Sequence, residues 1–250
     1  METDDKKIVD KMLSAAKKAG ADSADVCFIK GHGLDVQVRL GKVESAERSE
    51  DYQVGMRVFV GRRSASISTG QLDDENIAEL AERAVSMAKI APEDPYARLA
   101  TKAEQATSLP EIELFDDTSI PTEQLSDMAL SCEAAALDEA GISNSDGASA
   151  STGMTEILIG TSTGFSAAYK RSSFGISAVV LAEKDGQMER DYDYSASVFA
   201  EDLESPEISA EAQLNAPCKG WAHASPKQAA FLLFMTSGFR ALLPDILQAA

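Results

Sequence analysis

With 250 residues the chain can form one large domain or two ordinary ones, and its 44% hydrophobic content is enough for packed cores. Its 41 acidic and 23 basic residues give a formal net charge of −18, and so acidic a body repels phosphate backbones. The composition therefore excludes an intrinsically disordered chain and argues against a nucleic-acid-binding protein.

The cysteines and the apolar runs bear on the compartment. The three cysteines, Cys27, Cys132 and Cys218, are far apart and form no C-x-x-C, as expected of reduced thiols in the cytoplasm. Residues 1–5 are acidic and carry no apolar core of a signal peptide, and no apolar run reaches membrane-spanning length. We therefore expect a cytoplasmic protein with no membrane partner.

Residues 1–100 predict a first unit of helices and antiparallel strands. Apolar residues recur at helical spacing over 4–19 and 74–91, and Asp73 stands where the second helix needs a cap. Between the helices, alternating patterns predict several strands separated by glycine-containing turns. The predicted strands cover 25–30, 34–40, 43–48, 52–60 and 64–69, with turns at 31–33, 41–42 and 61–62.

Residues 121–207 predict a second unit of the same kind, reached through a proline-containing linker over 101–120. A helix is expected over 122–139, followed by an antiparallel meander with strands at 155–159, 165–170, 174–183 and 187–199. The predicted class is α+β, with two units that each pack one or two helices on an antiparallel sheet. Residues 208–250 form a tail of different composition that carries the only tryptophan, and from Glu207 onward the chain has no formal net charge.

The longest predicted hairpin turns at Lys184-Asp185-Gly186, because Asp and Gly tolerate the backbone of a two-residue loop. In its second strand Arg190, Tyr192 and their alternate neighbours share an apolar-aromatic face. The other face is acidic and carries Glu189, Asp191, Asp193 and Ser195. These carboxylates could bind a cation or act as a base, but alternating acids on a strand are more often a solvated face.

Other chemistry has little support in the sequence. Neither histidine stands in an H-E-x-x-H motif, and no phosphate-binding glycine loop precedes a helix. We therefore expect neither a metal site nor a catalytic residue in this chain. Arg57, with Arg62 and Arg63, could hold a peptide carboxylate, although a solvated hairpin end explains these arginines more simply.

Two runs resemble the TldD/PmbA family, also named modulators of DNA gyrase. Residues 54–61, VGMRVFVG, with 65–69, ASIST, are similar to its first-domain hairpin. Residues 186–195, GQMERDYDYS, resemble the central-domain strand of its PmbA (TldE) branch. The order of helices and strands also fits that family, up to about residue 206.

The resemblance implies a PmbA-type subunit of a cytoplasmic metallopeptidase complex that acts in proteolysis and peptide maturation. Such a subunit lacks zinc, which the TldD-type partner carries, and activity is expected only with that partner. The resemblance also implies that extended or unfolded peptides are held by backbone pairing. Residues expected to contact substrate or partner are Arg57, Glu189, Arg190, Asp191 and Tyr192.

The chain departs from the family after about residue 209, where relatives continue into a C-terminal domain. We expect residues 208–250 to replace that domain, as an early reading-frame change would cause. Two alternatives stay open beside the non-catalytic subunit. One is a free-standing peptide-binding or adaptor module, and the other is an autonomous hydrolase with an unrecognised site. Co-purification with a zinc-bearing partner, or chelator-sensitive cleavage by the isolated chain, distinguishes these readings.

Overall fold

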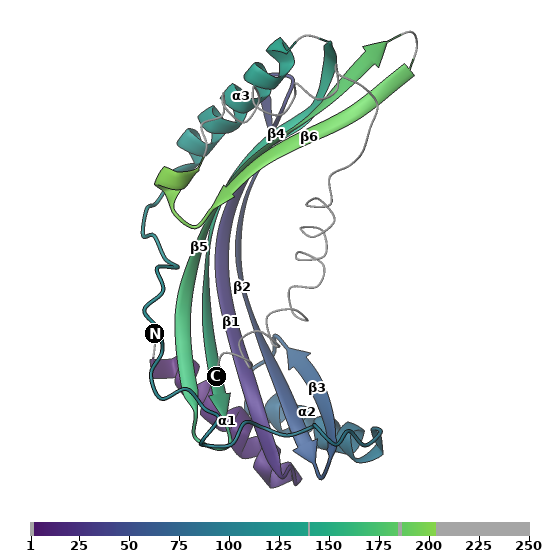
Figure 1. Ribbon diagram of the computed structural model, residues 1–250, viewed down its shortest axis with the longest axis vertical. Helices are drawn as coiled ribbons and strands as arrows, with labels where there is room; N and C mark the ends of the chain where they lie inside the picture. Colours follow the sequence, from purple (N-terminus) through teal and green to yellow (C-terminus); the bar gives the residue numbers. More distant parts are fainter. Residues whose placement is uncertain (1–2, 140, 185–186, 204–250) are drawn as a thin grey trace.

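The computed structural model describes residues 3–139, 141–184 and 187–203, and the predicted tail at 208–250 lies outside this part. Its six strands form one antiparallel sheet with the order β3-β2-β1-β4-β5-β6 (Figure 1). The α+β class is confirmed, and the strands of both predicted units belong to the same sheet. The elements are α1 (Thr3–Ala19), β1 (Ser23–Arg39), β2 (Lys42–Val60), β3 (Arg63–Thr69), α2 (Asp74–Ile90), α3 (Thr122–Asp138), β4 (Ile142–Thr161), β5 (Ser166–Lys184), β6 (Gln187–Ser197) and a short 3-10 helix (Ala200–Asp202).

The three helices begin and end within one residue of their predicted bounds. Asp73 caps α2 as expected, because its side chain accepts the backbone N–H of Asn76 at 3.0 Å. The apolar stripe of α2 is buried along its whole length, from Ile77 to Ala88. Helical periodicity and capping were therefore sufficient to place these elements.

Four of the strands are longer than predicted. β1 runs without interruption through Gly31 and Gly33, so the predicted turn at 31–33 is wrong. Gly33 pairs with Ser49 on one side and Gly153 on the other, and a Cβ at Gly33 would lie 3.3 Å from Ser49 Oγ. Glycine here allows neighbouring strands to approach closely. β2, β4 and β5 likewise extend through segments that were expected to lie between strands or to precede them.

The predicted hairpin turns at the strand ends do form. Gly41 and Gly61 have φ angles of 72° and 60°, which is the left-handed region that glycine adopts readily. Lys184 pairs with Gln187, so β5 and β6 form the expected long hairpin. Its turn residues, Asp185 and Gly186, lie outside the described residues.

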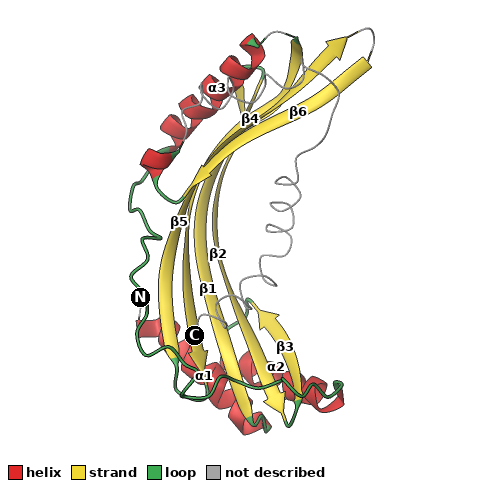
Figure 2. Cartoon of the chain, viewed as in Figure 1, coloured by secondary structure: helices red, strands yellow, loops and turns green. Residues whose placement is uncertain are grey.

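All three helices lie on one face of a bowed sheet, and Figure 1 shows α3 on its convex side. The reason is visible along β1, where the buried hydrophobic residues, Ala24, Val26, Phe28, Val36 and Val38, all have even numbers and therefore lie on one face. Figure 2 shows α1 and α2 at one end of the sheet and α3 at the other. Each end has its own core, and each core takes residues from both predicted units. Leu158 of β4 belongs to the core under α1 and α2, and Val36 of β1 belongs to the core under α3.

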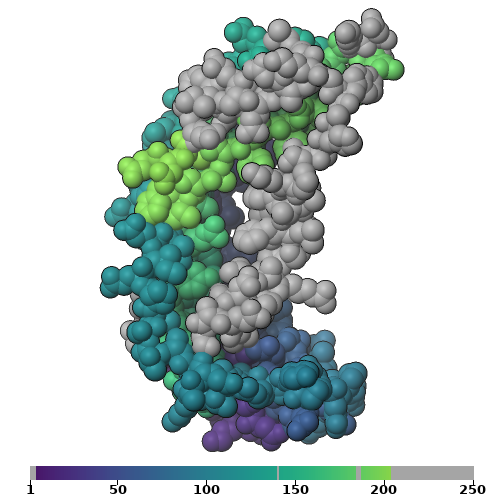
Figure 3. Space-filling model, viewed as in Figure 1, coloured from purple at the N-terminus to yellow at the C-terminus, as the bar shows by residue number. Residues whose placement is uncertain are grey.

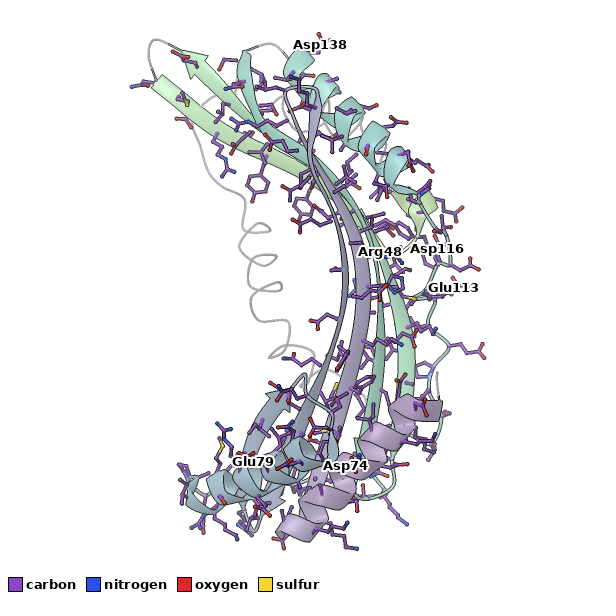
Figure 4. All side chains as sticks on the ribbon, turned by 180° about the vertical axis from the view of Figure 1, so that it is seen from behind. Arg48, Asp74, Glu79, Glu113, Asp116 and Asp138 are labelled. Carbon is purple, nitrogen blue, oxygen red and sulfur yellow. The ribbon has the colours of Figure 1, made fainter. Side chains whose placement is uncertain are left out.

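The linker between α2 and α3 lies along one edge of the molecule beside β5, in teal in Figure 3. The backbone oxygen of Leu114 accepts the N–H of Ser172 at 3.0 Å, which holds the linker to β5. Figure 4 shows Glu113 and Asp116 on this segment, outside the convex side of the sheet at the middle of its length. The linker is therefore part of the fold rather than a free tether.

Candidate functional site on the helix-free face

The face of the sheet opposite α1, α2 and α3 is called here the helix-free face, because no helix of the described residues lies on it. β6 presents its aromatic side to this face. Tyr192 pairs with Val179, whereas Asp191 and Asp193 pair with Val180 and Ala178, which are buried in the core under α3. Residues that pair across antiparallel strands share a face, so the acidic side of β6 lies on the helix side.

Burial on β6 differs from the expectation of a solvated acidic face. Asp193 is only 8% exposed, whereas Tyr192 is 39% exposed. Asp193 lies beside the second core, and its Oδ1 accepts the backbone N–H of Tyr194 at 2.7 Å. The alternation along the strand is confirmed, but the expectation of a solvated acidic face is wrong for Asp193. Because a buried carboxylate needs a hydrogen-bond donor, this contact explains why Asp193 can lie beside the core without a role in catalysis or metal binding.

The remaining predicted residues of β6 lie close together near the free end of the hairpin. Arg190 reaches across β5, and its Nη2 lies 3.1 Å from Oδ2 of Asp146 on β4. Asp191 Oδ1 accepts the N–H of Tyr192 at 2.9 Å, and Glu189 is exposed. The result is an exposed tyrosine ring beside a held guanidinium on an edge strand. Such a surface can contact a peptide through ring stacking and hydrogen bonds, and it contains no nucleophile.

Arg57 belongs to a different part of the molecule. It lies on β2, and three strands separate β2 from β6 in the sheet. Its Nε donates to both carboxylate oxygens of Asp25 at 3.2 Å, and its guanidinium carbon lies 5.1 Å from the centre of the Phe59 ring. Asp25 is 8% exposed. The structure therefore does not bring Arg57 together with the predicted residues of β6, and it gives Arg57 a buried partner.

A band of small residues crosses the middle of the helix-free face, and the sequence reading missed it. Ser49, Gly33, Gly153 and Ser173 pair in one row across β2, β1, β4 and β5. A Cβ on Gly153 would lie 3.0 Å from Ser173 Oγ, a tight contact, so a side chain at Gly153 would require the serine to move. Because Gly33 was predicted to lie in a turn, and Ser49, Gly153 and Ser173 between or before strands, the sequence did not predict that they line up on one sheet.

The described ranges contain neither a cluster of metal ligands nor an activated cysteine. No group of three or more His, Cys, Asp or Glu side chains there is placed to hold a metal ion. Burial raises the pKa of the Cys27 thiol to about 11, so this cysteine is protonated near neutral pH and is a poor nucleophile. The assignment of zinc to a partner subunit stays a prediction. No helix in the described ranges is long and apolar enough to span a membrane.

Comparison with known proteins identifies the family. Residues 24–88 match the PmbA/TldA metallopeptidase domain 1, and residues 115–216 match the PmbA/TldA metallopeptidase central domain. The chain belongs to the PmbA/TldD family. It is 31% identical over 206 residues to Metalloprotease PmbA of Escherichia coli O157:H7, covering 81% of this chain and 46% of that protein. It is 33% identical over 195 residues to the PmbA homolog of Haemophilus influenzae, covering 78% and 43%.

Solved structures support the same fold for this PmbA/TldD family member. A putative modulator of DNA gyrase from Bacteroides thetaiotaomicron has a TM-score of 0.77 at 20% identity, covering 86% of this chain and 49% of that one. TldE from Thermococcus kodakarensis has a TM-score of 0.59 at 15% identity, covering 83% and 46%. The chain thus spans about half the length of the relatives that it matches.

Proposed function

We propose that this PmbA/TldD family member is a PmbA/TldE-type subunit of a cytoplasmic metallopeptidase complex. In this complex the chain is non-catalytic and helps to hold extended peptide, while a TldD-type partner carries zinc and cuts. The complex then serves proteolysis and peptide maturation. This proposal depends mainly on the matches of the chain to both family domains and to Metalloprotease PmbA.

One feature of the structure supports the peptide-holding part of this proposal. The helix-free face ends at an edge strand with the exposed ring of Tyr192 and the guanidinium of Arg190 held by Asp146. An edge strand can bind peptide through its backbone, which reads little of the peptide sequence, and an exposed ring can stack on the peptide.

The test is co-expression with a TldD-type subunit, followed by affinity purification through a tag on this chain. We expect the two chains to elute together and to hydrolyse an unstructured fluorogenic peptide. A zinc chelator should abolish the activity, and added zinc should restore it. The isolated chain should show no hydrolysis. Chelator-sensitive cleavage by the isolated chain, or failure of the two chains to associate, would contradict the proposal.

A matched pair of variants tests the contribution of β6. Tyr192→Ala removes the exposed ring at the free edge, whereas Tyr96→Ala removes an 85% exposed ring from the linker. We expect Tyr192→Ala to raise the KM of the complex for peptide several-fold, by about the contribution of one ring contact. Tyr96→Ala should leave KM unchanged. Equal effects of the two substitutions on KM would show that β6 does not contact the peptide.

A further inference from the structure

The outer edge of β5 is paired along only part of its length. β6 pairs with this edge from Phe174 to Lys184. At Ser172 the linker takes the place of β6, because the Ser172 N–H donates to the backbone oxygen of Leu114. Backbone groups of an antiparallel strand point alternately to either side, so Ala168 and Lys170 direct their N–H and C=O the same way as Ser172. Within the described residues, no hydrogen bond reaches these outward groups of Ala168 and Lys170, and both residues are exposed.

A hollow of about 370 Å³ lies beside this unpaired stretch. Its lining is mainly apolar and comes from the linker, from β5 and from the segment after β6. Two of the linker side chains are unusually exposed for their size, Ile112 at 62% and Phe115 at 39%. The lining includes Ile112, Leu114, Phe115, Tyr169, Lys170 and Phe199.

The walls of the hollow are held in place by a junction at Ser172, which is 2% exposed. The Ser172 hydroxyl donates to Val198 O at 2.7 Å and accepts the N–H of Asp116 at 2.8 Å. Asp116 Oδ2 in turn accepts the N–H of Ala200 at 2.8 Å. The linker is therefore fixed to β5 at Ser172, on one side of the hollow. On the other side the Gln105 amide donates to the Thr163 hydroxyl at 2.7 Å, in the turn before β5. Lys170 is also held, by Glu156 at 2.8 Å and over the Phe115 ring at 5.9 Å.

We propose that an extended peptide binds here as an added strand along β5 at Ala168–Lys170, with one apolar side chain in the hollow. An extended peptide is the expected ligand because β6 already pairs with this edge of β5 from Phe174 to Lys184, and Leu114 pairs with it at Ser172. A peptide strand at Ala168–Lys170 would continue the same row of hydrogen bonds and satisfy the outward backbone groups. The inference deepens the proposed function and rests on its peptide-holding part, and it adds a second position, away from β6, at which the peptide is held.

The probe is a capped pentapeptide, Ser-Thr-Leu-Thr-Ser, carrying a fluorophore and titrated with the full chain alone by anisotropy. Two N-methylated versions provide the matched control. Methylation at one residue blocks an N–H that faces β5, and methylation at the next residue blocks one that faces away. We expect the version whose blocked N–H faces β5 to bind about tenfold more weakly than the other version, because it loses one hydrogen bond. Equal affinities, or no binding of the parent peptide up to about 1 mM, would overturn the proposal.

Variants of the chain locate the site. Ala168→Pro removes one outward N–H and leaves the groups that face β4 intact, and Phe115→Ala removes one wall of the hollow. Each variant should weaken peptide binding about five- to tenfold without lowering the thermal midpoint of unfolding. Tyr96→Ala should leave peptide binding unchanged. Unchanged affinity in both variants would place the peptide elsewhere, and concentration-dependent dimerisation lost in Ala168→Pro would assign the edge to a second copy. Because no partner subunit is present, failure here leaves the co-purification and hydrolysis results of the proposed function standing.

Discussion

The carboxylate of Glu133 on α3 accepts the backbone N–H of Leu40, the first residue of the turn between β1 and β2, at 2.8 Å. The same carboxylate accepts the N–H of Gly41 at 2.8 Å and the hydroxyl of Ser145 at 2.5 Å. Glu133 is 2% exposed, and Leu40 has a φ of 48°, in the left-handed region that is costly for a leucine. One buried side chain therefore holds a strained turn and the start of β4 against α3.

Replacing Glu133 should lower the free energy of unfolding. Glu133→Ala leaves two backbone donors and a hydroxyl without their acceptor, so we expect a loss of about 2–4 kcal/mol. Glu133→Gln keeps one acceptor oxygen and should lose less. Urea unfolding followed by circular dichroism measures both, with the exposed Asp127→Asn on the same helix as the control. A loss for Glu133→Ala no larger than that of the control would show that the turn holds itself.

The relation between Glu133 and Leu40 illustrates what the sequence could not predict. Ninety-three positions separate the two residues, and a glutamate in an amphipathic helix ordinarily faces solvent. The helices themselves were predictable, because periodicity and the Asp73 cap act locally. Which helix residue turns inward depends on the strands packed beneath it, and that information is not local.

The strands show a second limit. On β1, Val26 and Phe28 before Gly33 share their parity with Val36 after it, as in a single strand, but the polar Lys30 and His32 interrupt the apolar pattern and glycine is also a common turn residue. The pairing of Gly33 with Gly153 decided between the two, and it belongs to the sheet rather than to the segment. On β6 the alternation predicted two faces, but the position of α3 determined that Asp193 is buried and Tyr192 exposed.

Gly160 should not tolerate a side chain. A Cβ at this position would overlap Cγ1 of Val9, because α1 packs directly on β4 there. Gly160→Ala must displace α1 or strain β4, and we expect a loss of about 1–3 kcal/mol in stability. The double variant Gly160→Ala with Val9→Ala should recover part of it, because the shortened Val9 makes room. Thermal unfolding measures the coupling, and Gly70→Ala is the control in open surroundings. Strictly additive losses would rule out the contact.

The Asp116 carboxylate should make the linker junction sensitive to acid. Hydrogen bonds from the backbone N–H of Ala200 and from Thr118 hold the pKa of Asp116 below its usual value. A depressed pKa in the folded state adds stability above the ordinary value of about 4, and this contribution is lost as the pH falls through the lower folded pKa. The urea midpoint of Asp116→Asn should therefore lie below the wild-type midpoint at pH 6, and the difference should shrink progressively as the pH falls below about 4. Asp117→Asn, an exposed neighbour, should follow the wild type throughout.

Arg57 and Tyr192 should separate stability from peptide contact. Arg57 donates to the nearly buried Asp25, so Arg57→Ala leaves that carboxylate without its counter-ion and should lower stability by about 1–3 kcal/mol. Tyr192 is exposed on the helix-free face, and Tyr192→Ala should change stability by less than about 0.5 kcal/mol. Urea unfolding and peptide binding are measured on both variants. At a temperature where both are folded, Arg57→Ala should bind peptide like the wild type. Weakened binding with intact stability in Arg57→Ala would instead place the arginine at the peptide, because loss of the pair with Asp25 alone cannot produce it.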